Sequence, residues 1–501
     1  MSDEHKEFRG SEFVGYAPRF EPRTSTGASS IFERGEGAFL GSAVLGATLT
    51  TADIFFALLA LPAVQVGLGG SDQALQLVVA IHSAAFASVL IAAGRLGDSI
   101  GANRVCMLGL GLMVAAATLA TLAPSMEVFI VARGLQGIAA GCVTPQIIAL
   151  VGTRFQGVKR RKAFAAFALA QALGAVLGQL VAGAIIETNV FGLGWRGPFA
   201  LLAPAAFFGL VLMARYVDER RSPQKRPLDL SGTALCALLL VLITWSLTVG
   251  RLPEQGAVWL DGLLAAVLVG VIFGIHQFKL DRAGRHPMLP LQSLRNPRVR
   301  LGLLAAFVFY LGVLSFYWLV GIHSQRELQL SPWAAGCLFA VFGFGFTIST
   351  ALGPRISART QRQVLYWGSI GLAGAHGLGI VVSLFDPNIV GTAAYLFFAG
   401  VGIGSIMAPL MATVTSEADS RDAGAVAGLF GTVQATGNGL GASLVPIAYL
   451  SQEIGSKSGL PINGYGTSLL LLLLASLFLT LMIRRLLKGQ RPRPIPDKGG
   501  F

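Results

Sequence analysis

Residues 53–62 read Asp53-Ile-Phe-Phe-Ala-Leu-Leu-Ala-Leu-Pro62, which places one carboxylate deep inside a long apolar stretch. Residues 133–141 read Arg133-Gly-Leu-Gln-Gly-Ile-Ala-Ala-Gly141 and place one guanidinium inside another. Fourteen apolar stretches run through the chain, and Asp53 and Arg133 are the only formal charges well inside them. A charge inside a membrane-spanning helix is costly, so it normally faces a partner or a water-filled cavity and marks a transport or proton path. These two residues are therefore the first candidates for function.

Hydropathy defines the fold class. Hydrophobic residues make up 53% of the 501 positions and charged residues only 13%. The apolar stretches are close to the length of about 20 residues that a helix needs to cross a bilayer. Short polar breaks separate most of them, so sequential helices should be antiparallel neighbours. The sequence predicts an all-α membrane protein with 14 transmembrane helices.

Two longer breaks, at 216–229 and 279–300, are basic and rich in proline and flank the seventh and eighth stretches. The chain therefore divides into six helices, a pair and six helices, as in transporters built from repeated bundles. Identity between the halves is too weak to establish the repeat from sequence. We predict five segments: a disordered cytoplasmic N-terminal tail (1–37), a six-helix bundle (38–215), a linker with two extra transmembrane helices (216–300), a second six-helix bundle (301–485) and a cytoplasmic tail (486–501).

The net charge of +13 follows from membrane topology. If the chain starts inside, 33 of the 38 Lys and Arg residues fall on the cytoplasmic side, and only Arg196, Arg251, Arg326 and Lys457 fall outside. Lys and Arg accumulate in cytoplasmic loops of membrane proteins. We therefore expect both termini in the cytoplasm, a multi-pass protein of the inner (plasma) membrane with the lipid bilayer as its partner, and no binding of nucleic acid.

Motifs for soluble enzyme chemistry are missing from the sequence. It has no Gly-x-x-x-x-Gly-Lys loop for nucleotide phosphates and no cluster of His and Cys at metal-ligand spacing. We predict no enzymatic activity, no cofactor and no metal site. Energy for transport must then come from a gradient.

The polar break after the second stretch reads Gly94-Arg-Leu-Gly-Asp98-Ser-Ile-Gly101-Ala-Asn-Arg104. The first stretch carries an aspartate nine residues before the proline of Ala-Leu-Pro, and the fourth carries Arg-x-x-Gln-Gly. With these motifs and the polar break, the chain resembles the 14-helix drug:proton antiporters (the multidrug efflux family) of the major facilitator superfamily. The resemblance covers about residues 38–485 in layout and is sharpest over 53–183. It implies two helical bundles and proton-coupled export by alternating access.

The resemblance implies that the first and fourth helices are neighbours, and helix geometry then brings the two charges together. Asp53 lies about 22 Å from the cytoplasmic start of its span, and Arg133 about 9 Å from the outer end of an oppositely directed span. Both depths fall in the outer half of a core about 30 Å thick. A carboxylate that alternates between an arginine and a proton is a minimal coupling device. The alternative is a static ion pair that only sets helix register.

The resemblance assigns Gly94, Asp98, Gly101 and Arg104 to a cytoplasmic gate. The glycines permit close approach and a sharp turn, and Asp98 is expected to meet the N-terminus of the helix that begins near Ala423, a favourable place for an anion. Three positions that are usually basic in the family carry other residues here. The gate contact is therefore expected to be weaker than in the family pattern.

The fifth stretch carries Gly174, Gly178, Gln179 and Gly183, a spacing of small residues that suits close helix contact. Gln179 stands where the family has a proline. Phe55 likewise stands where a threonine is usual. The phenylalanine makes the site around Asp53 more apolar, and both departures weaken the inference of drug antiport and leave symport or lipid translocation open.

Candidate residues for the substrate cavity are Phe55, Gln136, Gln325 and Tyr310. Gln136 lies one helical turn from Arg133, and Tyr310 belongs to an aromatic-rich stretch suited to a flat lipophilic or cationic substrate. Core or lipid-facing aromatic side chains are the alternative. The intramembrane histidines, such as His82 and His376, are expected to be simply hydrogen-bonded in most cases.

The function predicted from these observations is secondary active, proton-coupled export of a lipophilic small molecule, which can include cations. We expect the protein to act as a monomer, with the cargo and protons as its partners. One alternative is an exporter or flippase of an endogenous lipid, siderophore or metabolite on the same fold. A second alternative is a membrane sensor that does not transport.

Overall fold

The computed structural model describes residues 34–217, 229–248, 258–285, 287, 289, 291–352, 358–385, 388–418, 423–454 and 464–488. Over these residues every regular element is a helix. The predicted N-terminal tail lies almost wholly outside the described residues, and so does most of the predicted C-terminal tail.

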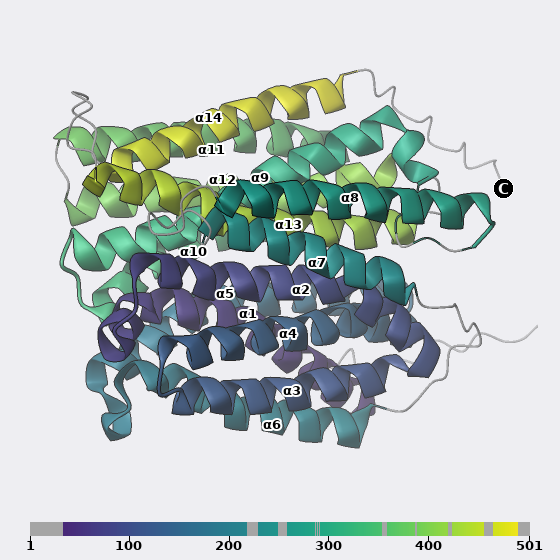
Figure 1. Cartoon of the computed structure of the whole chain (residues 1–501), viewed down its shortest axis with the longest axis horizontal. Helices are drawn as coiled ribbons and strands as arrows, with labels where there is room; N and C mark the ends of the chain where they lie inside the picture. The colour runs from purple at the N-terminus through teal and green to yellow at the C-terminus, as the bar shows by residue number, and fades with distance from the viewer. Residues whose placement is uncertain are drawn as a thin grey trace, which may run out of the picture.

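Two bundles of six helices and one additional pair make up this part of the chain (Figure 1). The N-terminal bundle consists of α1 (Arg34–Leu68), α2 (Asp72–Ile100), α3 (Ala102–Leu122), α4 (Met126–Arg154), α5 (Gly157–Thr188) and α6 (Gly197–Tyr216), with short 3-10 turns at Val190–Gly192 and Gly194–Arg196. The pair is α7 (Leu230–Thr248) and α8 (Val258–Arg282), followed by a 3-10 turn at Ser293–Arg295. The C-terminal bundle consists of α9 (Pro297–Arg326), α10 (Pro332–Leu352), α11 (Ala358–Phe385), α12 (Ile389–Ser416), α13 (Ala423–Ile454) and α14 (Gly464–Leu487).

Twelve of these helices are long and apolar enough to cross a membrane. Helix α7 contributes only the shorter apolar segment Leu230–Ile243, and α13 is not among the twelve. Several helices extend past the predicted spans: α1 begins at Arg34, and α2 continues to Ile100. Hydropathy detects the apolar part of a helix, whereas the backbone hydrogen bonds continue into the polar ends.

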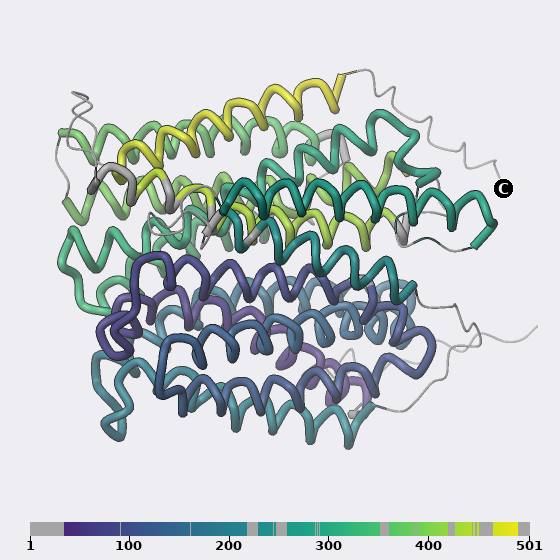
Figure 2. Tube along the Cα trace, viewed as in Figure 1, coloured from purple at the N-terminus to yellow at the C-terminus, as the bar shows by residue number. Residues whose placement is uncertain are grey.

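The two bundles share one packing scheme. In the first, α1 packs on α5 and α6, α2 on α4, and α3 on α4 and α6. In the second, α9 packs on α13 and α14, α10 on α12, and α11 on α12 and α14. Each pair in the first bundle recurs eight helices later, and the contacts between bundles, α5 with α10 and α2 with α13, follow the same relation. The structure therefore reveals the repeat that sequence identity was too weak to establish; Figure 2 shows the purple-to-blue and green-to-yellow halves side by side.

The inserted pair lies against the line where the bundles meet. Helix α7 packs on α8, α2 and α13, and apolar side chains from all four helices, including Ala84, Cys236, Phe273 and Ala435, form one buried cluster. The pair is thus part of the packed helical body and not a separate domain.

Asp229 anchors the beginning of α7. Its carboxylate accepts hydrogen bonds from the backbone N–H of Gly232 at 2.8 Å and from Gln277 at 2.7 Å, and it lies 2.8 Å from Nε2 of His276. Burial acts to raise the pKa of Asp229, but its contacts with His276, Gly232 and Gln277 outweigh burial and hold that pKa below its ordinary value. The contact of Arg95 in α2 with the carbonyl oxygen of Pro287 ties the connector after α8 to the first bundle.

Glycines set the closest helix contacts. A Cβ at Gly137 in α4 would overlap the backbone carbonyl oxygen of His82 in α2, and one at Gly400 in α12 would overlap the carbonyl oxygen of Phe342 in α10. These contacts occupy corresponding positions in the two bundles, α2 with α4 and α10 with α12. Small residues that let backbones touch are the usual means of packing helices where lipid gives no hydrophobic driving force.

Substitution of Gly137 tests the α2–α4 contact. The Gly137→Ala variant should lose about 1–3 kcal/mol of stability, because the new methyl group forces two backbones apart. The matched control is Gly134→Ala on the same helix, where the Cβ would meet only the Ile81 side chain at 3.6 Å. That variant should be neutral or gain up to about 1 kcal/mol from helix propensity. Thermal unfolding in detergent measures both, and equal effects at the two positions would contradict the assigned contact.

Candidate functional site

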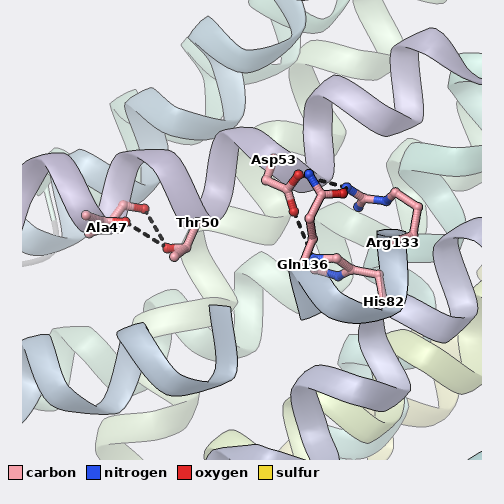
Figure 3. A network of polar contacts seen from close by, with 7 residues as sticks. Ala47, Thr50, Asp53, His82, Arg133 and Gln136 are labelled. Carbon is pink, nitrogen blue, oxygen red and sulfur yellow. Dashed lines mark hydrogen bonds and ion pairs between the residues drawn. The ribbon is translucent and has the colours of Figure 1, made fainter. Parts of the chain in front are cut away.

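The two charges singled out in the sequence lie side by side in the N-terminal bundle. Nη1 of Arg133 in α4 donates to Oδ1 of Asp53 in α1 at 2.7 Å, and it also donates to Oε1 of Gln136 at 2.7 Å. A third helix contributes His82 of α2, whose Nε2 lies 3.0 Å from Oδ2 of Asp53. Figure 3 shows these four side chains converging on one point. Both carboxylate oxygens of Asp53 are thus engaged, each by a different helix.

The whole network is shut off from the surface. Asp53 and Gln136 are 0% exposed, and His82 and Arg133 are 1% exposed. Two donors at this site, Nε of Arg133 and Nε2 of Gln136, are buried with no hydrogen-bond partner among the described residues. Buried unpaired donors are costly, so these two N–H groups are available to an acceptor on a bound molecule or to water.

The surrounding helices are drawn together at the level of the network. In α5, Gly178 lies against Ala52, the neighbour of Asp53, so that a Cβ would be 3.1 Å from the Ala52 Cα. Helix α4 is even closer to α2 at Gly137, next to Gln136, where a Cβ would overlap the carbonyl oxygen of His82. Gly178, which the sequence singled out for helix packing, therefore brings α5 against α1, and Gly137 brings α4 against α2 beside the network.

Helix five serves two surfaces. Gly174 and Gly178 face α1, where a Cβ at Gly174 would be 2.7 Å from the carbonyl oxygen of Thr48. Gly183 and Gln179 face α10 of the other bundle, and a Cβ at Gly183 would be 2.5 Å from the carbonyl oxygen of Pro332. The Gln179 side chain is buried, and its Oε1 has no partner among the described residues. The close contact expected from the spacing is present in spite of the missing proline.

The candidate gate residues lie at the end of the bundle that holds the α2–α3 connection. Gly101 has a φ of 106° and makes the turn, a backbone conformation that glycine adopts easily and other residues do not. Gly94 lies within α2, so the segment from Gly94 to Ile100 is helical and not a polar break between helices. The gate role of the four residues stays a prediction. The motif continues the helix because a single left-handed residue is enough to reverse the chain.

Asp98 and Arg104 are both exposed. Helix α13 begins at Ala423 after residues 419–422, which lie outside the described part of the chain, so the contact predicted for Asp98 stays a prediction. Gln146 links α4 to α2 in this region, a contact that the sequence did not reveal. It is buried in α4 and donates Nε2 to the carbonyl oxygen of Ala93 in α2 at 2.7 Å, in the space that Gly97 leaves free.

The four residues proposed for the substrate cavity lie in four different surroundings. Gln136 belongs to the charge network, and Gln325 donates Nε2 to the carbonyl oxygen of Leu59 at 3.0 Å. Phe55 packs edge-to-face on Tyr317 across the bundle interface with ring centroids 4.7 Å apart. Tyr310 is buried beside Phe430. Their contact with substrate stays a prediction.

The bundles are joined firmly at the opposite end, where α1 ends and α2 begins. Arg326 of α9 contacts both Asp72 and Gln65 of the N-terminal bundle. Nearby, Gln325 holds Leu59, and the backbone N–H of Trp333 donates to Oε2 of Glu187 at 3.2 Å. These polar contacts close the space between the bundles at the α1–α2 end.

Two six-helix bundles related by an internal repeat, with a charge network buried among apolar helices, define a membrane transporter. The sequence model of the Major Facilitator Superfamily matches residues 43–442. The chain belongs to this superfamily, whose members are transporters and not enzymes.

Several curated relatives match most of the chain. It is 31% identical to a probable actinorhodin transporter of Streptomyces coelicolor, over 77% of this chain and 68% of the relative. It is 30% identical to the puromycin resistance protein pur8 of Streptomyces alboniger, over 77% and 76%, and 26% identical to the drug efflux pump JefA of Mycobacterium tuberculosis, over 80% and 78%. The chain is therefore a transporter of the drug-efflux type within the superfamily.

Solved structures share the fold at low identity. The peptide transporter POT in complex with sulfate superposes with a TM-score of 0.60 at 17% identity, over 89% of this chain and 94% of that one. The human organic anion transporter TETRAN gives 0.60 at 15% identity, over 90% and 100%.

A double-mutant cycle tests whether Asp53 and Arg133 depend on each other. Arg133→Gln should cost about 3–5 kcal/mol, because it leaves a buried carboxylate without its cation. Adding Asp53→Asn to that variant should restore part of the loss, since both charges are then gone. Thermal unfolding of the four proteins gives the coupling.

The control for this cycle is the more exposed ion pair of Lys159 with Glu36, whose charged atoms are 2.7 Å apart. Neutralising Lys159 there should cost no more than about 1 kcal/mol. Additive effects of the Asp53 and Arg133 substitutions would contradict the assigned pairing.

Proposed function

We propose that this protein exports a lipophilic small molecule in exchange for protons, with Asp53 as the proton carrier and Arg133 as its partner. The observation that carries the proposal is a completely buried carboxylate that an arginine holds on one oxygen and a histidine on the other. A buried ion of this kind marks a proton path more often than a purely structural contact. Removal of the arginine by substrate or by helix movement would favour protonation of the desolvated acid.

Two features support export of a lipophilic cargo. Relatives named for actinorhodin transport, puromycin resistance and drug efflux match across most of the chain. The surface between the bundles is aromatic, with Phe55 of α1 against Tyr317 of α9, and Tyr317 in turn stacked near Phe339. Flat aromatic or cationic molecules suit such a surface. The free N–H groups of Arg133 and Gln136 would add recognition of an acceptor oxygen.

Export or flipping of an endogenous lipid, siderophore or metabolite is the second candidate. The replacement of polar family residues near Asp53 by apolar ones such as Phe55 favours it. In that case the cargo would enter from the bilayer, and a lipid would compete with drugs for transport. Coupling by symport instead of antiport would reverse the direction in which an acid exterior drives the cargo.

We further propose that all fourteen helices cross the inner membrane, with both termini and the α2–α3 end in the cytoplasm. The chain then divides into the five segments that the sequence predicts. The bias of Lys and Arg toward one side supports this orientation. Helices α7 and α8 then form an extra transmembrane hairpin that packs beside α2 and α13. In this arrangement the contact of Arg326 with Asp72 lies at the outer face.

Reporter fusions test this topology. Green fluorescent protein should fluoresce when fused after Arg221 or after Phe501, and alkaline phosphatase should be active when fused after Gln255. The reason is that the α7–α8 connection is placed outside and the flanking connectors inside. Alkaline phosphatase activity after Arg221, or fluorescence after Gln255, would contradict the assignment of fourteen spans.

Transport by the Asp53→Asn variant tests the coupling. Proteoliposomes with an imposed pH gradient are screened with ethidium, puromycin and a fluorescent phospholipid, and the cargo that wild type moves is then given to the variant. Gradient-driven transport should fall at least about a hundred-fold, the usual contribution of a positioned proton-transfer group, whereas exchange of cargo for cargo should persist. Full gradient-driven transport by Asp53→Asn would overturn the mechanism; Glu36→Gln, at a distant ion pair, is the control.

A further inference from the structure

His82 is the one member of the charge network that the proposed coupling mechanism leaves without a task. It lies on α2, is 1% exposed, and holds the carboxylate oxygen that Arg133 does not touch. The charged and titratable groups that face it among the described residues are Asp53 from α1 and Arg133 from α4. No acid or base from α7 or α13 faces it in that part of the chain.

The chemistry of the contact assigns the proton on the imidazole. An ionised carboxylate can only accept hydrogen bonds, so Nε2 of His82 must carry the proton that it shares with Oδ2 of Asp53. The other ring nitrogen, Nδ1, is then the acceptor in a neutral ring. An imidazole in this state can take a proton on one nitrogen while it gives one up from the other.

We infer that His82 is a proton relay, through which Asp53 gains and loses its proton. This inference rests on the proposed function and names the route that the proton takes. In the loading step, once a rearrangement has opened the site to water, a solvent proton binds Nδ1 of His82, and the proton on Nε2 moves to Oδ2 of Asp53. The products are a neutral carboxylic acid and a neutral imidazole of the opposite tautomer. Release runs the same transfers in reverse, so protons and charge balance in each direction.

The position of His82 links this relay to the contact between the bundles. Its backbone carbonyl lies against Gly137 of α4, so α2 cannot approach α4 more closely at this level. Its neighbour Ser83 faces α13 of the C-terminal bundle, where a Cβ at Gly439 would be 3.2 Å from the Ser83 Cβ. If the contact with α13 shifts α2 relative to α1, it moves His82 relative to Asp53. The histidine is placed to connect and disconnect the acid as the bundles rearrange.

The Asp53–Arg133 pair alone does not require this histidine. An arginine and a carboxylate would neutralise each other without it, and a hydrogen-bond donor such as serine or glutamine would satisfy Oδ2 equally well. Only a group with two exchangeable positions can both hold the carboxylate and pass a proton. The Gln variant of this position keeps the donor and removes the exchange, which separates a relay from a structural contact.

The first measurement uses the wild-type protein without any cargo. Nitrogen NMR of protein labelled at histidine reports the tautomer of each ring, with the His82 signal assigned by its loss in His82→Gln, and infrared spectroscopy reports the acid band of Asp53, assigned by its loss in Asp53→Asn. As the pH is lowered, His82 should change from the Nε2–H to the Nδ1–H tautomer in step with the appearance of the acid band. An unchanged tautomer, or an imidazolium that forms before the acid band, would overturn the relay.

The second measurement is the rate at which the acid band appears after a rapid drop in pH. His82→Gln should slow it at least about ten-fold, because a positioned acid–base group typically contributes about a hundred-fold or more to proton transfer. The matched control is His376→Gln, another buried histidine, whose Nδ1 is paired with Ser476 at 3.0 Å in the other bundle. The His376→Gln variant should protonate Asp53 at the wild-type rate. A wild-type rate in His82→Gln as well would overturn the relay.

The two proposals fail in distinguishable ways. If Asp53 shows no acid band over the whole pH range in which the protein stays folded, the proposed proton carrier itself is wrong. If the band appears at the normal rate in His82→Gln, Asp53 remains the carrier and only the relay is wrong.

Discussion

The buried ion pair of Asp53 and Arg133 constrains the whole N-terminal bundle. Two charges removed from water are tolerated only when direct hydrogen bonds replace their hydration, and here those bonds come from side chains on three helices. Helices α1, α2 and α4 must therefore meet at one depth. Gly137 lets α4 touch α2 at this depth, and Gly178 lets α5 touch α1 beside Asp53, because neither carries a side chain where the backbones meet. Burial of the charges therefore depends on close packing of the helices.

The repeat divides the work between its halves. Both bundles use the same packing scheme and similar glycine contacts, yet the buried ion pair belongs to the first bundle. The second presents aromatic side chains, with Tyr317 of α9 reaching Phe55 of α1. The scaffold supplies matched interfaces between the bundles, α5 with α10 and α2 with α13. The charged half and the aromatic half meet between the bundles, where Phe55 packs on Tyr317.

Much of this architecture was predictable from hydropathy and spacing. The helices of both bundles and the inserted pair follow from apolar length, and the meeting of Asp53 with Arg133 followed from depth along antiparallel helices, once the resemblance had made α1 and α4 neighbours. The same arithmetic places His82 at a similar depth in α2, so its position was predictable. Its contact with Asp53 was not, because a lone histidine in a membrane helix is expected simply to be hydrogen-bonded. Gln146, in contrast, gave no signal, because its partner is a backbone carbonyl that any residue could offer.

The sequence by itself determined that the chain is a bundle of apolar helices with one aspartate and one arginine in its interior, because the cost of burying charge and polar backbone in lipid leaves few alternatives. Only the tertiary structure decided that His82 shares the carboxylate with Arg133, that the bundles repeat, and that the glycine motif continues α2 up to a single turn with positive φ at Gly101. Those outcomes depend on the rotation of each helix about its axis and on contacts between residues far apart in the chain. Hydropathy and spacing along a single helix carry no information about either.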